Sequence, residues 1–188
     1  CYYYKEIAKA ELTGEENYLE FDAVSSSAEV FWNGASLAVH HGGYSRFRVK
    51  IPADNIKETN LLTVCADNTP NEEVYPQTAD FTFYGGIYRG VKIISVPSSH
   101  FDLDYYGAPG VMVTPKIVGN DAEIHFEVFA KIADDAMFLY EIYDGDNRLC
   151  ATATKETKEW LGIENVHLWN GRKDPYLYTF KASISLDG

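Results

Sequence analysis

Apolar and polar side chains alternate at every second position through most of this chain, and the three-to-four-residue period of an amphipathic helix is nearly absent. In residues 45–51, for example, three apolar side chains alternate with three basic ones. Successive side chains of a strand point to opposite faces, so such a segment forms a strand with one buried face. The pattern therefore predicts an all-β protein.

Short segments with this alternation are separated by turn-forming residues, and each is predicted to be a strand. Asn33-Gly34 predicts a tight hairpin turn, because both residues tolerate positive φ. The predicted strands cover residues 2–4, 18–24, 28–32, 37–40, 45–51, 61–66, 91–96, 122–130, 136–143, 148–154, 163–169 and 178–186.

A length of 188 residues allows one large domain or two small ones. The segment Pro97-Ser98-Ser99-His100 separates a strand rich in β-branched residues from a new pattern, so we expect two domains, residues 1–97 and 98–188. Roughly eight strands in the first favour a jelly roll over a barrel. About seven short strands in the second favour an immunoglobulin-like sandwich without the cysteine pair of antibody domains.

The charge of the chain excludes some partners. Formal net charge is -12, and the 16 Lys and Arg residues are scattered, so nucleic acid and an anionic membrane surface are not expected as partners. No apolar run approaches the roughly 18 residues that cross a bilayer. A neutral ligand such as a sugar is compatible with this charge.

The cysteines and histidines give no sign of a metal centre or a disulfide framework. The three cysteines lie far apart in sequence, and Cys65 and Cys150 are predicted to be small core residues. Adjacent His40 and His41 would point to opposite faces of a strand, so they are not expected to ligate one ion. No firm metal site is predicted.

The strongest functional signal lies in residues 76–89. Asp80 stands there between a polar loop and the aromatic run Phe81–Tyr84, and Gly85-Gly86 follows. A carboxylate accepts hydrogen bonds from sugar hydroxyls and aromatic rings pack on sugar C–H faces, so this pairing suits a sugar site. The alternative is that Asp80 ends a loop and caps nearby backbone N–H groups.

These residues carry a resemblance to a known family. The run around Asp80 is similar to the amino-terminal sugar-binding domain of glycoside hydrolase family 2, most closely that of its β-galactosidases. A second motif, near the end of the chain, resembles the one that closes the family's immunoglobulin-like domain. The residues that match these motifs are Asn33, Gly34, Gly42, Gly43, Tyr44, Gly85, Gly86, Arg89, Trp169, Pro175 and Tyr178.

The resemblance implies a role for Asp80. In the galactosidases, the carboxylate six residues ahead of the Gly-Ile-aromatic-Arg stretch reaches the active site and contacts substrate or a bound cation, and Asp80 has that spacing to Gly86. The implied cation in the intact enzyme is Mg or Na, and no cofactor is expected for the fragment itself. Gly85 and Gly86 are expected to shape the corner that aims Asp80. For Arg89, a structural ion pair is favoured over ligand contact.

The resemblance covers nearly the whole chain and implies a retaining exo-β-glycosidase whose catalytic glutamates lie on a (β/α)8 barrel beginning after Gly188. Such a barrel needs about 200 residues, so none fits here and no catalytic residue is expected in this chain. We expect an N-terminally truncated, non-catalytic fragment that shapes the pocket for a β-galactoside-type carbohydrate and supports its own barrel or a homo-oligomer. The alternatives are a free-standing carbohydrate-binding module, or the same fragment from a β-glucuronidase or β-mannosidase. The compartment stays open, with a cytoplasmic, bacterial-type enzyme favoured.

Overall fold

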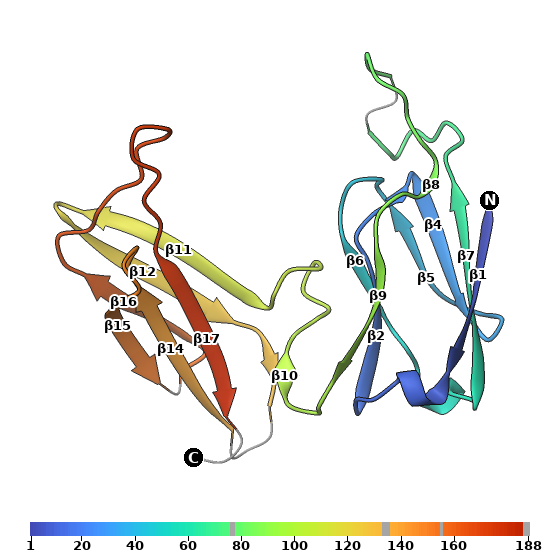
Figure 1. Ribbon diagram of the computed structural model, residues 1–188, viewed down its shortest axis with the longest axis horizontal. Helices are drawn as coiled ribbons and strands as arrows, with labels where there is room; N and C mark the ends of the chain where they lie inside the picture. Colours follow the sequence, from blue (N-terminus) through green and yellow to red (C-terminus); the bar gives the residue numbers. More distant parts are fainter. Residues whose placement is uncertain (76–77, 133–135, 155, 186–188) are drawn as a thin grey trace. The chain divides into compact units, whose positions relative to one another are not determined.

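In the computed structural model the chain forms two compact units, Cys1–Pro97 and Ser98–Gly188 (Figure 1). The structure describes residues 1–75, 78–132, 136–154 and 156–185. Within these ranges the helical segments are two 3₁₀ turns, η1 (Lys9–Glu11) and η2 (Ala53–Asn55), and no helix is long and apolar enough to span a membrane. The prediction of an all-β chain made of β-sandwiches is confirmed.

The first unit is built from two antiparallel sheets and a short ribbon. One sheet has the order β1-β7-β4-β5, the other β6-β2-β9, and β3 pairs with β8. The strands of this unit are β1 (Tyr2–Ala8), β2 (Glu16–Phe21), β3 (Val24–Ser25), β4 (Ser27–Trp32), β5 (Ala35–His41), β6 (Phe47–Lys50), β7 (Thr59–Asp67), β8 (Gly86–Ile87) and β9 (Val91–Val96).

The core of the first unit lies between these two sheets. Leu19 and Phe21 on β2 are fully buried, as are Val30 and Trp32 on β4. The indole of Trp32 donates a hydrogen bond of 3.0 Å to the carbonyl oxygen of Asn55, so its one polar atom is satisfied inside the core. Alternating apolar side chains from both sheets thus make one continuous cluster.

Asn33 and Gly34 form the turn between β4 and β5, with φ of 52° and 88°. The Asn33 side chain donates to the carbonyl oxygen of Asn55 at 2.7 Å and accepts from the backbone N–H of Leu61 at 2.9 Å. It also contacts the side chain of Asn60, a buried residue. The turn is therefore tied to the start of β7 as well as closing its own hairpin.

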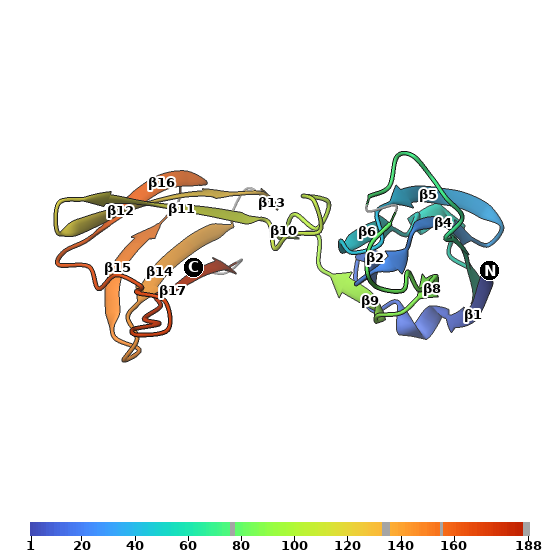
Figure 2. The ribbon, with the colours of Figure 1, turned by 90° about the horizontal axis from the view of Figure 1, so that it is seen from above.

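The second unit has two three-stranded antiparallel sheets, β11-β12-β16 and β15-β14-β17, and a ribbon of β10 and β13 (Figure 2). Its apolar clusters are formed by inward-facing residues such as Ile124, Phe126, Phe138 and Ile142. The strands are β10 (His100–Phe101), β11 (Val111–Val118), β12 (Asp121–Val128), β13 (Ala130–Lys131), β14 (Met137–Tyr143), β15 (Leu149–Thr154), β16 (Lys158–Ile163) and β17 (Thr179–Ser185).

Three sequence predictions in this unit need correction. The predicted strand 163–169 is wrong, because β16 ends at Ile163 and the chain then turns at Asn165, whose φ is 47°. Cys150 is not a core residue but is exposed on β15. The strand β11 is missing from the prediction, since its mostly exposed residues show no alternation and include a proline at position 115. Residue 186 of the last predicted strand lies outside the described residues.

Candidate functional site

The residues singled out around Asp80 belong to the long connection between β7 and β9 in the first unit. Its first part is fixed by short side-chain turns. The Asp67 carboxylate accepts a hydrogen bond of 2.9 Å from the backbone N–H of Thr69, which lowers the pKa of Asp67, and the Asn71 side chain accepts one of 2.9 Å from Glu73. Val74 is buried and anchors this segment.

The connection is anchored again where it approaches β9. Gly86 and Ile87 form β8, which pairs with Ser25 and Val24 of β3. Gly86 has a φ of +92°, and a Cβ placed on it would overlap the Tyr3 hydroxyl, so glycine is required there on two counts. The same Tyr3 hydroxyl accepts a hydrogen bond of 3.3 Å from the backbone N–H of Ile87.

Two of the glycine motifs meet at this anchor. A Cβ on Gly43 would lie 3.1 Å from the Ser25 hydroxyl oxygen, and Ser25 is the strand partner of Gly86. The Tyr88 phenol donates a hydrogen bond of 2.5 Å to the carbonyl oxygen of Gly43. The preceding residue, Gly42, has a φ of +123° that favours glycine. The loop that continues into exposed Tyr44 is therefore held against the loop that carries Asp80.

Asn33-Gly34 lies in the sheet β1-β7-β4-β5, at the end far from the Asp80 loop. Along β4, Ser27 pairs with Asp67 while Trp32 pairs with Leu62, so the strand runs away from the Asp80 loop toward the hairpin. Its role in this unit is to fix the β4–β5 turn.

Asp80 lies in an exposed, irregular stretch between these anchors. Its carboxylate accepts no hydrogen bond from a backbone N–H of the residues that the structure describes, unlike Asp67 and Asn71. The capping alternative is therefore not supported by the described contacts. The rings of Phe81 and Phe83 pack at 4.9 Å between centroids, and Phe81, which follows Asp80 in sequence, remains exposed.

A small cavity lies under the loop. Its volume is about 120 Å³, well below the roughly 300 Å³ at which ligand pockets begin, so it does not enclose a sugar. The loop is instead an open surface on which the exposed carboxylate of Asp80 is followed by several aromatic rings. The cavity is lined by Ser25, Ser26, Asn68, Thr69, Pro70, Asn71, Val74 and Phe83.

Arg89 does not make the ion pair expected for it with any described residue. Its guanidinium group lies over the ring of Tyr88 at 5.3 Å from the centroid, a cation–π contact on an exposed surface. Within the part of the chain that the structure describes, no hydrogen bond uses the five N–H donors of Arg89, so they face solvent or a ligand.

The second motif forms a structural loop in the second unit. His167 donates its backbone N–H to the Tyr178 hydroxyl at 2.9 Å, and its ring stacks on Tyr176 at 3.9 Å. Tyr178 packs against the apolar cluster of that unit, while Trp169 and Pro175 are exposed. The motif therefore fixes the 164–178 segment and displays an indole on its surface.

Among the described residues, no group of three or more His, Cys, Asp or Glu side chains is placed to hold a metal ion. Asp80 is the one acidic residue in 78–90. A second carboxylate ligand for a Mg or Na ion at Asp80 would therefore have to come from outside residues 78–90.

The sequence prediction of the site gives no anchoring role to three residues of the anchor. Tyr3 and Ser25 carry no local signal, because each meets Gly86 only through strand pairing or packing between distant segments. Tyr88 lies within residues 76–89, two residues after Gly86, so an anchoring role for its phenol could have been predicted. Its partner Gly43 is 45 residues away.

Comparison with known proteins identifies the class to which this β-sandwich and its loop belong. The family described as "Glycosyl hydrolases family 2, sugar binding domain" matches residues 1–97, the whole of the first unit. The chain therefore belongs to glycoside hydrolase family 2.

Individual relatives carry two different names. A beta-glucuronidase of Bacteroides fragilis is 31% identical over 96% of this chain and 28% of its own length. A beta-galactosidase of Thermoanaerobacter pseudethanolicus is 25% identical over 91% of this chain and 24% of its own length. The crystal structure of an FMN-binding beta-glucuronidase from Facaelibacterium prausnitzii L2-6 matches with a TM-score of 0.87 and 38% identity, over 98% of this chain and 30% of that one. The chain thus spans less than a third of the length of each.

Proposed function

We propose that this chain is a non-catalytic, substrate-facing part of an exo-β-glycosidase, in which Asp80 contacts the sugar. The observation that carries the proposal is a loop that is fixed at both ends and presents a carboxylate without a hydrogen bond to the described backbone. Both ends of the loop are fixed by hydrogen bonds and strand pairing, yet Asp80 accepts no hydrogen bond from a described backbone N–H. Among the described residues Asp80 has no hydrogen-bond partner, so its carboxylate is open to accept hydrogen bonds from a ligand.

The neighbouring groups suit a carbohydrate. An ionised carboxylate accepts strong hydrogen bonds from hydroxyl groups. Exposed Phe81 and Tyr84 offer ring faces for the C–H surface of a pyranose, and Arg89 lies near the end of the same loop. Asp80, the exposed rings and Arg89 thus offer a hydrogen-bond acceptor, apolar faces and a cation to a polar, ring-shaped ligand.

Bond cleavage is assigned to a part of the protein outside these 188 residues. A retaining glycosidase needs two carboxyl groups about 5–5.5 Å apart around the scissile bond. Asp80 is the one carboxylate in residues 78–90, and the cavity beneath the loop is lined by hydroxyl, amide and apolar side chains. The isolated chain is therefore expected to release no product from a glycoside. The exposed Trp169 and Leu177 of the second unit give the catalytic part, or another protomer, an apolar surface to cover.

The sugar is proposed to be a β-glucuronide or a β-galactoside. The local motif is most similar to β-galactosidases, whereas the relatives at 31% and 38% identity are named beta-glucuronidases. An exposed arginine in the loop favours the glucuronide, because its carboxylate pairs with a guanidinium. Any Mg or Na requirement is assigned to the intact enzyme.

The proposal is tested on the complete gene product with nitrophenyl β-glucuronide, β-galactoside and β-mannoside. Asp80→Asn keeps the shape of the side chain but removes its charge, and should lower kcat/KM on the preferred sugar by roughly 10- to 100-fold, the worth of one hydrogen bond to a charged group. Asp54→Asn, an exposed aspartate on η2, is the matched control and should leave kcat/KM unchanged.

Two results would overturn the proposal. The first is equal activity of the Asp80 variant and the wild type on every sugar. The second is release of nitrophenol by the purified 188-residue chain, with loss of that activity on Asp80→Ala. A gene product without hydrolase activity that still binds sugar would favour a free-standing carbohydrate-binding module.

A further inference from the structure

In the second unit, the sheet β11-β12-β16 forms one layer of the sandwich (Figure 2), and its outer face carries an exposed tryptophan. On β12, Ile124 and Phe126 are buried, so the side chain of His125 between them faces away from the core. Its strand partner on β16 is Trp160, which therefore lies on the same outer face. Trp160 is 55% exposed, although tryptophan is highly buried on average.

The indole of Trp160 leans along its strand toward Gly162, the next residue on this face. A Cβ placed on Gly162 would lie 3.8 Å from the ring carbon Cζ3 of Trp160, an ordinary van der Waals distance. Because residue 162 has no side chain, nothing at that position covers the ring. The indole thus offers an open apolar surface within the face of the sheet.

A hollow of about 290 Å³ lies beside the indole, close to the roughly 300 Å³ at which ligand sites begin. The strand register brings its walls together in two rows that cross all three strands. One row is Thr114, His125 and Trp160, and the next is Met112, Glu127 and Lys158.

Ion pairs between neighbouring strands hold the polar groups on this face. Lys158 Nζ lies 3.2 Å from Glu127 Oε2. Glu123 Oε2 lies 3.0 Å from Lys116 Nζ and 3.2 Å from His125 Nε2. A carboxylate has about four acceptor sites and an ammonium group has three donors, so each paired group keeps capacity for a hydroxyl group.

We propose that this outer face binds a neutral carbohydrate chain. One pyranose ring packs its C–H surface on the indole of Trp160, and its hydroxyl groups exchange hydrogen bonds with Glu127 and Lys158. An apolar ring bordered by both donors and acceptors matches a pyranose, which has an apolar face and a rim of hydroxyl groups. The proposal rests on the geometry of this face and not on the function proposed for Asp80.

Two other kinds of partner suit the face less well. Protein interfaces are depleted of Lys and Glu, whereas each of the two Lys–Glu pairs here places both residue types on the face. A polyanion would meet a chain with a formal net charge of -12. A neutral glycan meets neither obstacle, because the paired charges on the face already balance each other.

Native gel electrophoresis of the complete gene product, in gels that contain soluble galactan or xylan, tests the proposal. At least one of these neutral polysaccharides should retard the wild type. Trp160→Ala should weaken the retardation by roughly tenfold or more, since the stacking surface is lost. Trp160→Tyr keeps an aromatic ring and should retain most of the retardation.

The matched control is Tyr106→Ala, an exposed aromatic residue of the second unit that lies outside the sheet. It should be retarded like the wild type. Asp80→Asn separates this proposal from the proposed function, because it should lower the hydrolysis of nitrophenyl glycosides and leave the retardation unchanged. Trp160→Ala should do the reverse.

Three results would overturn the carbohydrate site. The first is a wild type that neither polysaccharide retards. The second is equal retardation of the wild type and Trp160→Ala. The third is a change of oligomeric state on Trp160→Ala in size-exclusion chromatography, because the indole would then contact another protomer.

Discussion

The phenol of Tyr88 donates a hydrogen bond of 2.5 Å to the carbonyl oxygen of Gly43, which ties the Gly42-Gly43 loop to the loop that carries Asp80. Tyr88→Phe removes this bond and keeps the ring. We expect a loss of about 1 kcal/mol in the free energy of unfolding by urea denaturation, together with faster amide exchange in residues 85–90.

Tyr84→Phe is the control for this prediction, because Tyr84 is an exposed tyrosine of the same loop. It should change neither quantity. Equal behaviour of the two variants would show that the Tyr88 hydroxyl does not hold the loops together.

The fold was predictable from the sequence wherever strands bury one face. β4 and β12 alternate buried with less buried side chains along their whole length, and their apolar residues report that burial directly. β11 shows no such alternation, because it is an edge strand and exposed along most of its length. The order of polar and apolar residues in it therefore does not indicate a strand. The predicted strand 163–169 fails for a related reason. Its apolar residues Leu168 and Trp169 lie on the surface of a loop.

The candidate site was predictable only in part. Asp80, the aromatic run and the glycine pair are adjacent in sequence, so their chemistry could be read together. The contacts that fix them come from Tyr3, Ser25 and Gly43, and these depend on strand register between distant segments. A single sequence contains no signal for that register at this corner.

Gly86 offers a test of how tightly this corner is packed. Gly86→Ala strains a backbone with φ of +92° and also overlaps the Tyr3 hydroxyl, whereas Gly34→Ala has a similar φ of +88° with open space around the new Cβ. We expect a loss of about 1 kcal/mol for Gly34→Ala and about 2 kcal/mol or more for Gly86→Ala in urea denaturation. Tyr3→Phe in the Gly86→Ala background should recover part of the loss, since it removes the overlapping oxygen. Additive effects of the two substitutions would contradict the contact.

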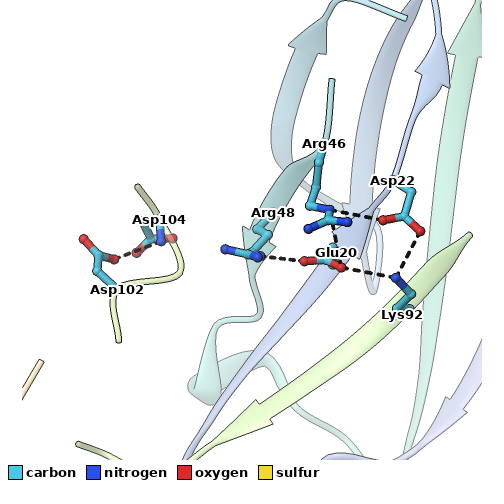
Figure 3. A network of polar contacts seen from close by, with 7 residues as sticks. All are labelled: Glu20, Asp22, Arg46, Arg48, Lys92, Asp102 and Asp104. Carbon is cyan, nitrogen blue, oxygen red and sulfur yellow. Dashed lines mark hydrogen bonds and ion pairs between the residues drawn. The ribbon is translucent and has the colours of Figure 1, made fainter. Parts of the chain in front are cut away.

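The ion-pair network on the sheet β6-β2-β9 makes a prediction about acid stability (Figure 3). Arg48 Nε lies 2.8 Å from Glu20 Oε2, and both side chains are buried, at 7% and 6% exposure. Arg46 and Lys92 approach the same carboxylate at 3.7 and 3.4 Å. Burial acts to raise the pKa of Glu20, but the hydrogen bond from Arg48 and the charges around it outweigh burial and lower the pKa overall.

A carboxyl group with a lowered pKa in the folded state stabilises the fold above its ordinary pKa of 4.5, and that stability is lost as the pH falls toward the folded-state value. Glu20→Gln should therefore cost about 3 kcal/mol at pH 7, because it removes the negative charge that faces buried Arg48. It should also flatten the decline in unfolding free energy below pH 4.5. Glu58→Gln, at an exposed pair with Lys9, should cost less than about 1 kcal/mol. Equal effects of the two substitutions would show that burial does not strengthen the network.

Tyr140 makes the opposite kind of prediction, in which removing a polar group does no harm. It is fully buried in the second unit, its ring packs against the rings of Phe126 and Phe138, and its hydroxyl has no hydrogen-bond partner among the described residues. Burial, with the nearby charges of Glu156 and Glu159, raises the pKa of Tyr140 to about 12. Since a buried hydroxyl without a partner costs about 1–3 kcal/mol, Tyr140→Phe should leave the free energy of unfolding unchanged or raise it by about 1 kcal/mol.

The pH dependence at Tyr140 follows from the same burial. The unfolded chain ionises its phenol near pH 10, before the folded chain does, so the fold loses stability as the pH rises above 10. Urea denaturation between pH 9 and pH 11 should show a steeper loss for the wild type than for Tyr140→Phe, which has no phenol at this position. A destabilised variant at pH 7 would mean that the hydroxyl is hydrogen-bonded after all.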